Sequence, residues 1–405
     1  MCHKKRRNTH SAFFLLIFIK EIPLADFIFK ISPNITLGSY TIARLGQFAK
    51  DWGTRYMLIL DPALKDFDIN TKIEASLKDR SIEYFTFDDI SDSSDTSTVE
   101  RALKLAREAH VHGIICAGGT RAGNVARATA SLYNEMHSIF DYIDGAAPTT
   151  AALPFIAIPT SMRDSFLFTT HSPITDSRSN KAKLLKLQNG LCKLALFDPN
   201  LILNHSQNKR TSIGLRTLCI AIEAYISQKS NFFSDTILEK AIELTWKGLD
   251  TTSTVDTATS QEVSFAQGGC MTSFGSALSS LGQASLVSLA IESRYKIDAS
   301  LTTTILLPYI IEEASKYKGD KLAQIAFIMG LSNNPSDIQT NIDALLEEIR
   351  TKIALANLPA RLKELSVSIE QLALCAEDAG ALEIMNGLSR SMTSDDLFEL
   401  IKQAY

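Results

Sequence analysis

The chain has 405 residues, a formal net charge of −4 and 45% apolar residues. This length is sufficient for two sizeable domains, each with its own core. The negative charge argues against a protein that holds nucleic acid through a phosphate-neutralising surface. The six cysteines never occur in a C-x-x-C spacing, and several lie in apolar runs. We therefore expect buried, reduced thiols rather than disulfides.

The first 28 residues differ from the rest of the chain. Four basic residues at positions 4–7 precede an apolar run at 12–19, a pattern similar to a secretory signal. The run is well under the about 20 residues that span a bilayer, and no convincing cleavage site follows it. We predict that residues 1–28 are a disordered extension or lie upstream of the true start, and that the protein is cytoplasmic.

Residues 29–200 alternate short apolar runs with amphipathic stretches, the best example being a helical pattern at 97–110. The expected strands cover 56–60, 82–87, 113–117, 155–158 and 194–197. Continuous apolar strands separated by helices indicate a parallel sheet covered on both faces. This part is therefore predicted to be an α/β, Rossmann-like domain of the nucleotide-binding type.

After residue 200 the strand patterns stop and 3.6-residue periodicity takes over. The expected helices cover 217–227, 234–249, 273–291, 302–316, 321–329, 335–356, 359–365, 369–377 and 394–404. The predicted fold class is thus α/β plus all-α. An α-helical domain at 201–405 follows the sheet domain, with a linker at 200–209 and a cleft between the domains.

Four short motifs carry a resemblance to a known family. Residues 118–128 read GGTRAGNVARA, 158–161 read IPTS, 221–227 read AIEAYIS and 305–308 read ILLP. In order and spacing they resemble the G-G-G-S-x-x-D-x-A-K-A, I-P-T-T, H-A-I-E-A-Y-V-S and I-L-L-P motifs of the iron-containing alcohol dehydrogenase superfamily, which includes glycerol dehydrogenase and dehydroquinate synthase. The resemblance runs from residue 29 to 405 and implies an NAD or NADP cofactor.

The resemblance implies a dinucleotide site at the glycine-rich turn. The residues expected to contact the cofactor are Gly118, Gly119, Thr120, Arg121, Asn124, Thr160 and Ser161. Glycines at a strand end let the backbone approach a pyrophosphate, and the next helix offers its N–H groups. Thr120 replaces the family's third glycine, and its β-carbon restricts φ and close approach. Arg121 could compensate by pairing with phosphate; the alternative is a tight turn with a solvated arginine.

The metal ligands that the resemblance implies are missing. The family's Asp, a His four residues later and two further His fall at Arg216, Ile220, Gln283 or Ser285, and Ala299. All seven histidines of the chain lie before residue 206. Arg216 is a cation and would repel a metal ion. We therefore expect no Fe or Zn and no metal-binding residue, which indicates a divergent, catalytically impaired paralogue, a pseudoenzyme.

Arginines replace these groups at family positions that line the cleft, namely Arg121, Arg163 and Arg216. One arginine carries about the charge of a divalent ion plus one aspartate. Arg216 therefore either binds an anionic phosphate or carboxylate group, or pairs with Asp164 or Glu223 and fills the vacated site. The catalytic residues are unknown. Arg216 and His171, a potential proton carrier, are the candidates.

Three functions stay open at this point. The first is a metal-free paralogue with a partly retained dinucleotide or anion cleft. The second is an active NAD(P)-dependent oxidoreductase that acts on an alcohol or aldehyde without the metal. The third is a structural or interaction protein. The expected partners are a small anionic or nucleotide ligand and a second copy of the chain, with no nucleic acid and no membrane.

Overall fold

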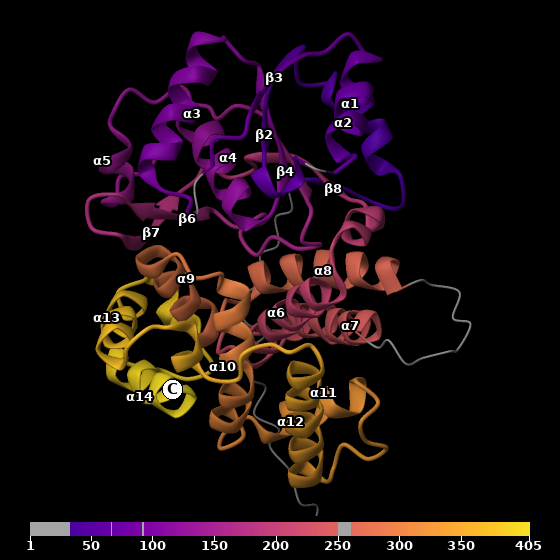
Figure 1. Ribbon diagram of the computed structural model, residues 1–405, viewed down its shortest axis with the longest axis vertical. Coiled ribbons are helices and arrows are strands. Elements are labelled where there is room, and N and C mark those ends of the chain that lie inside the picture. The colour runs from indigo at the N-terminus through magenta and orange to yellow at the C-terminus, as the bar shows by residue number, and fades with distance from the viewer. Residues whose placement is uncertain (1–32, 66, 91–92, 250–260) are drawn as a thin grey trace, which may run out of the picture. The chain divides into compact units, whose positions relative to one another are not determined.

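The computed structural model describes residues 33–65, 67–90, 93–249 and 261–405 (Figure 1). Residues 32–405 form one compact unit. The extension predicted at residues 1–28 lies outside the described residues. Of the cysteines, the five within the described ranges are buried and free, as predicted.

A six-stranded parallel sheet occupies the N-terminal half, in the order β1-β8-β5-β4-β2-β3. Its strands are β1 Asn34–Leu37, β2 Arg55–Leu60, β3 Glu83–Phe87, β4 Gly113–Gly118, β5 Phe155–Pro159 and β8 Cys192–Phe197. Every pairing within this sheet is parallel. The predicted Rossmann-like sheet is therefore confirmed. The chain runs outward from β2 to β3, and then from β4 in the opposite direction, so the order reverses between β2 and β4.

Helices cover both faces of this sheet, because alternate residues of each strand point to opposite sides. Leu58 and Leu60 of β2 share a core with α1 (Leu45–Ala49) and α2 (Ile69–Lys78). Met57 and Ile59 pack on the other side, against α3 (Thr96–Glu108) and α4 (Thr120–Leu132). Figure 1 shows the two pairs of helices on either side of β2 and β4. A short helix, α5 (Ile139–Ile143), follows α4.

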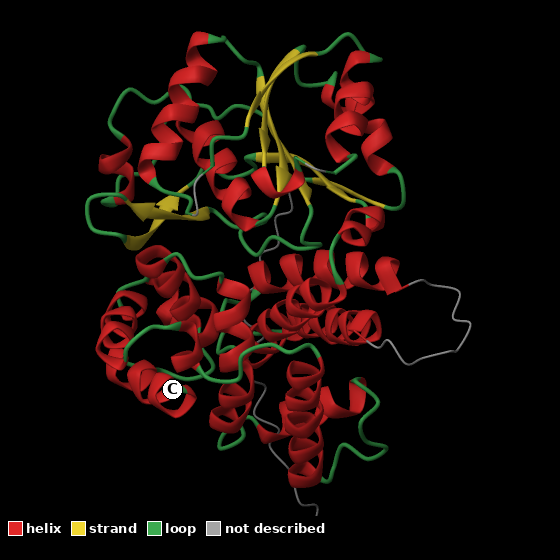
Figure 2. Cartoon of the chain, viewed as in Figure 1, coloured by secondary structure: helices red, strands yellow, loops and turns green. Residues whose placement is uncertain are grey.

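A hairpin of β6 (His171–Asp176) and β7 (Lys181–Lys186) forms a second, antiparallel sheet (Figure 2). No strand was predicted in this segment from the sequence, so the predicted set of strands was incomplete. Pro173 and the polar residues of β6 obscure the strand pattern. A two-stranded ribbon tolerates a proline because each strand has a free edge.

The C-terminal half is helical, as predicted (Figure 2). Its helices are α6 Gln207–Ile226, α7 Phe232–Leu249, α8 Gln261–Leu278, α9 Gln283–Tyr295, α10 Ala299–Ala314, α11 Gly319–Ile328, α12 Ile338–Leu355, α13 Ile369–Gly380 and α14 Ser394–Ala404. The predicted linker at 200–209 is instead a 3-10 helix, Pro199–Asn204, followed by the start of α6. The segment predicted as a helix at 359–365 is a short 3-10 helix, Leu362–Leu365.

The helix predicted at 273–291 is two helices, α8 and α9, separated just before α9 by Gly282. A β-carbon at Gly282 would lie 2.5 Å from Cδ of Glu223, so the break makes room for that side chain. Among the described helices, no single one is long and apolar enough to cross a bilayer. By length and composition alone, α8 and α9 together would be, with a bend of 99° between them.

Candidate ligand-binding site

A pocket of about 140 Å³ lies where the central strands of the sheet end. Asp61 follows β2, Gly119 and Thr120 follow β4, and Thr160 follows β5, and all four line the pocket. Residues of helices α6, α9 and α10 form the opposite wall. The strand order reverses between β2 and β4, and α/β proteins bind their ligands at such a point, beyond the carboxyl ends of the strands.

The glycine-rich turn closes tightly on the loop after β2. A β-carbon at Gly118 would lie 2.7 Å from Cβ of Ala122 and 2.8 Å from Cβ of Asp61, so only glycine fits. Gly119 caps α4 with φ −80°, and Thr120 is the first helical residue, without a positive φ. The backbone restriction expected of Thr120 therefore does not arise. The Gly119 amide, however, already donates to Oδ2 of Asp61 at 3.2 Å.

Of the residues predicted to contact a cofactor, Gly118 and Asn124 do not line this pocket. The five that do are Gly119, Thr120, Arg121, Thr160 and Ser161. Asn124 is 3% exposed and faces the interior. Its Oδ1 accepts a hydrogen bond from Nη2 of Arg127 at 2.6 Å, and its Nδ2 donates to Oγ of Ser94 at 3.3 Å. Asn124 therefore positions the Arg127 side chain and does not contact the pocket.

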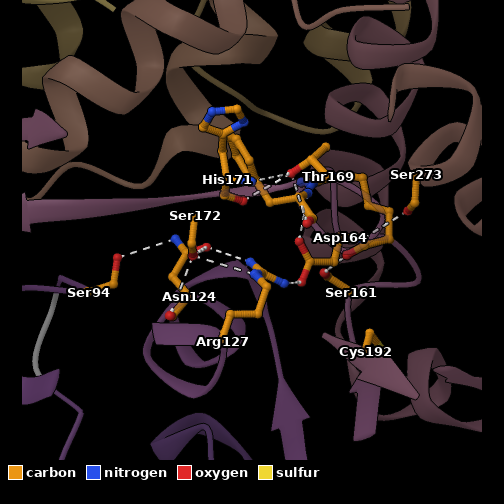
Figure 3. Close-up of polar contacts among 12 residues, drawn as sticks. Ser94, Asn124, Arg127, Ser161, Asp164, Thr169, His171, Ser172, Cys192 and Ser273 are labelled. Atoms are coloured by element: carbon orange, nitrogen blue, oxygen red, sulfur yellow. Dashed lines mark hydrogen bonds and ion pairs between the residues drawn. The ribbon is translucent and has the colours of Figure 1, made fainter. Parts of the chain in front are cut away.

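Arg127 is the centre of a buried polar network (Figure 3). Its guanidinium is 1% exposed and forms an ion pair with Asp164. The Asp164 carboxylate also accepts from the amide of Phe166 at 3.0 Å, while its own amide donates to Oγ of Ser273 at 2.9 Å. Asp164 therefore fixes the turn after β5 and belongs to Arg127. It is not the partner of Arg216.

Glu223, the other predicted partner of Arg216, is 1% exposed and caps the N-terminus of α9. It accepts from the amides of Ala284 at 2.6 Å and Ser285 at 3.3 Å, and from Oγ of Ser285 at 2.7 Å. Burial raises the pKa of the Glu223 carboxyl to about 7, although these hydrogen bonds oppose the shift. The predicted pairing of Arg216 with Asp164 or Glu223 is therefore wrong.

The four positions at which the resemblance implies metal ligands do not offer a metal donor set. Ile220 is 2% exposed and packs among apolar side chains that include Phe166 and Leu289. Ser285 donates to Glu223, and Ala299 is the buried first residue of α10. The described residues contain no group of three or more His, Cys, Asp or Glu that could hold a metal ion.

Gln283, the alternative to Ser285, donates through Nε2 to Oγ of Ser389 at 2.6 Å. The position of the family's Asp is held by Arg216, a cation on α6 that lines the pocket. A guanidinium, two alkyl side chains and a hydroxyl or amide do not match the imidazole and carboxylate donors that Fe²⁺ or Zn²⁺ prefer.

Arg163 lies beside Arg216 at the pocket wall and is 2% exposed. Nε and Nη1 of Arg163 and Nε of Arg216 are buried and donate no hydrogen bond to the part of the chain that the structure describes. Burial, and after it the charge of Arg216, hold the pKa of the Arg163 guanidinium well below its ordinary value. Two cations thus share the pocket wall without direct neutralisation.

Two carboxyl groups, those of Asp298 and Glu292, line the same pocket. Asp298 forms an ion pair with Nζ of Lys209 at 3.0 Å and accepts from the amide of Ser300 at 2.7 Å. Burial alone would raise its pKa, yet Lys209, Arg216 and the Ser300 amide together hold the pKa of Asp298 well below normal. Burial raises the pKa of the Glu292 carboxyl, while Arg216 opposes the shift.

His171, the second catalytic candidate, is not in this pocket. It starts β6 and lines a separate cavity of about 640 Å³. Its Nε2 lies 3.9 Å from a carboxylate oxygen of Glu383, and burial lowers the pKa of its imidazole. The structure therefore does not bring the two predicted candidates, Arg216 and His171, together.

Five titratable pocket residues were not predicted from the sequence as site residues: Asp61, His205, Lys209, Glu292 and Asp298. His205 is half-buried, and burial followed by the charge of Lys209 lowers the pKa of its imidazole. This imidazole is therefore neutral at pH 7. The only available signal was its position just after the last sheet strand and the Asp198-Pro199 breaker.

Comparison with known proteins identifies the class of protein. The family model of iron-containing alcohol dehydrogenase matches residues 32–199, and that of the C-terminal domain of the Fe-containing alcohol dehydrogenase family matches residues 211–405. The fold is therefore that of an oxidoreductase family. The chain belongs to the iron-containing alcohol dehydrogenase family.

Individual relatives are distant but span nearly the whole chain. Alcohol dehydrogenase 4 of Saccharomyces cerevisiae is 26% identical, covering 93% of this chain and 98% of its own length. The NADPH-dependent butanol dehydrogenase of Clostridium saccharobutylicum is 24% identical, covering 90% and 95%. The crystal structure of a 1,3-propanediol oxidoreductase superimposes with a TM-score of 0.84 at 19% identity, covering 92% and 98%.

Proposed function

We propose that this chain binds a nucleotide or small anion in the strand-end pocket without the divalent metal ion of its family. Where a family member holds the ion, that ion would supply a Lewis acid that polarises the alcohol oxygen. The observation that carries the proposal is the set of residues at the four expected ligand positions, namely Arg216, Ile220, Gln283 or Ser285, and Ala299. In this proposal the chain lacks metal-assisted alcohol oxidation and is catalytically impaired.

The dinucleotide site is only partly retained in this proposal. Gly118, the N-terminus of α4 and Arg121 support binding of a phosphate group. Asp61 opposes it, because its carboxylate occupies the Gly119 amide. The pocket of about 140 Å³ is also smaller than the roughly 300–1,000 Å³ that encloses most of a drug-sized ligand. Only the phosphate end of NAD or NADP would be enclosed.

A second candidate function is supported by the unpaired N–H groups of Arg163 and Arg216 beside a neutral His205. Such donors can polarise a carbonyl, although they lower the pKa of an alcohol less than a divalent ion does. The chain would then reduce an aldehyde with NADH or NADPH and would need no metal.

The test is a titration of NADH and NADPH into purified, chelator-treated protein, followed by fluorescence. Saturable binding in the micromolar range is the expected result. A turnover assay with aldehydes then separates the two candidates, since only the second gives chelator-insensitive reduction. Turnover that a chelator abolishes and Fe²⁺ or Zn²⁺ restores would contradict both. The cytoplasmic location, a homo-oligomer and the lack of nucleic-acid and membrane partners remain predictions.

A further inference from the structure

The pocket wall holds a buried cation whose donors have no acceptor. Arg163 is 2% exposed, and its Nε and Nη1 donate no hydrogen bond within the described residues. A buried charge without a partner costs several kcal/mol, and a second like charge beside it adds to that cost. Arg216 supplies that second charge and has a buried, unpaired Nε of its own. A bound negative group would remove both penalties.

The charged side chains that line the pocket leave positive charge in excess. Four are cations and three are acids, so one positive charge remains when all are ionised. The cations are Arg121, Arg163, Lys209 and Arg216, and the acids are Asp61, Glu292 and Asp298. Two of the acids are already engaged, Asp61 with the Gly119 amide and Asp298 with Lys209. Within the described residues, none of these acids accepts a hydrogen bond from Nε or Nη1 of Arg163 or from Nε of Arg216.

We propose that Arg163 and Arg216 form a binding site for a small oxyanion, either inorganic phosphate or a carboxylate of a few carbon atoms. Guanidinium groups present N–H donors in a planar fork that matches the oxygens of both. A pocket of about 140 Å³ accommodates an ion of this size and does not enclose a whole dinucleotide. Arg216, which lines this pocket, stands at one of the positions where the resemblance implies a metal ligand, so this inference rests on the metal-free pocket of the proposed function.

The oxyanion has two sources with the same chemistry. It is either a free ion or the phosphate of a larger nucleotide whose remainder lies outside the pocket. A free ion leaves NADH binding unaffected or is bound together with NADH. A nucleotide phosphate competes with inorganic phosphate for the same guanidiniums.

The test compares Arg163→Met and Arg216→Met with wild type by thermal unfolding in a phosphate-free buffer of constant ionic strength. Arg350→Met is the matched control, since Arg350 lies on α12, pairs with Glu312 and is remote from the pocket lining. Phosphate or acetate at about 100 times Kd should raise the wild-type and control Tm by a few degrees. Each pocket variant should bind phosphate or acetate at least about tenfold more weakly than the wild-type protein does.

The stability of the unliganded variants keeps this test decisive. Without phosphate, Arg163→Met should be at least as stable as wild type, because it removes an unneutralised cation. A less stable Arg163→Met protein would mean that the guanidinium has a structural role and would overturn the proposal. The proposal would also be overturned if the wild-type Tm did not respond to phosphate or acetate. The same holds if both pocket variants responded as strongly as wild type.

A metal assay on the same wild-type sample separates failure of this inference from failure of the proposed function. Bound Fe or Zn at one ion per chain overturns both. A metal-free protein that ignores phosphate and acetate overturns the oxyanion site alone. If phosphate does bind, competition between NADH and phosphate identifies a nucleotide phosphate as the source of the oxyanion. Independent binding of the two identifies a free ion.

Discussion

Arg127 and Arg163 are two equally buried arginines with opposite surroundings. The guanidinium of Arg127 meets the carboxylate of Asp164, the amide oxygen of Asn124 and, at 3.5 Å, the hydroxyl of Ser172. Nε and Nη1 of Arg163 meet no acceptor within the described ranges. Asp164 follows Arg163 directly in the chain, yet it pairs with Arg127. Burial of a charge therefore does not identify its role; the presence or absence of acceptors does.

The same contrast separates the two polar regions of the molecule. The Arg127 network ties α4 to the turn after β5 and to the β6–β7 hairpin, and its hydrogen bonds stabilise that arrangement (Figure 3). The Arg163–Arg216 pair faces a pocket at the ends of the strands. We interpret the first as a structural element and the second as a site that is completed by a ligand.

The largest expected effect comes from breaking the complete network. Arg127→Met should lower the free energy of unfolding by about 3–5 kcal/mol, because Asp164 is left buried without its cation. Urea denaturation measures this change. Arg101→Met is the control, since its ion pair with Asp89 is exposed and contributes about 1 kcal/mol or less. A loss from Arg127→Met no larger than the control would contradict the structural role.

The opposite sign is expected for the incomplete pair. Arg163→Met should raise the free energy of unfolding by about 1–3 kcal/mol in a phosphate-free buffer, because an unpaired cation becomes an apolar side chain of similar length. Urea denaturation under the same conditions gives the comparison directly. If Arg127→Met and Arg163→Met destabilise the protein equally, the distinction between the two arginines fails.

A pH titration sharpens the assignment of Glu223 to α9 rather than to Arg216. The pKa of its carboxyl is about 7 in the folded protein and near 4.5 when unfolded, so the folded state binds the extra proton between these values. The contribution of Glu223 to the free energy of unfolding, measured as wild type minus Glu223→Gln, should therefore fall as pH rises from about 4.5 to 7, by on the order of 1–3 kcal/mol.

The variant for this prediction is Glu223→Gln, which lacks the titrating group and should remove that slope. Arg216→Met should leave the slope in place, since Glu223 does not pair with Arg216. Stability that instead rises with pH over this window, and loses its pH dependence in Arg216→Met, would restore the predicted ion pair.

The smallest effect is expected at the glycine-rich turn. Asp61→Asn keeps an acceptor for the amide of Ala63 but removes a negative charge beside Gly119. Binding of NADH and of inorganic phosphate should become about threefold tighter, as expected for a partly screened charge at the pocket. Fluorescence titration measures this change. Weaker binding would mean that the Asp61 carboxylate itself contacts the ligand.

The sheet was predictable because its strands are buried on both faces and appear as continuous apolar runs, as in β4 and β5. The β6–β7 hairpin was not, since Pro173 and the polar residues of β6 interrupt the apolar pattern. The break between α8 and α9 was also missed, because helical periodicity continues through Gly282 and the reason for the break is a contact with Glu223, distant in the chain.

The candidate site was predictable only as a set of positions. The motif spacing located Arg163 and Arg216 near the cleft, and the structure lines the pocket with both. The carboxylates predicted to pair with Arg216 have other partners, because tertiary contacts decide the pairing. Asp164 pairs with Arg127, and Glu223 accepts hydrogen bonds from the N-terminus of α9. His205 and Glu292 follow no motif, so their presence in the pocket became visible only once the chain was folded.

The most direct test of the account is the metal content of the protein, purified without chelator from cells grown with added iron and zinc. A family member that retains the Asp and three His ligands, prepared in parallel, serves as the reference. We predict far less than one Fe or Zn ion per chain, and no gain in Tm when either ion is added. One tightly bound ion per chain, with a corresponding rise in Tm, would contradict the account.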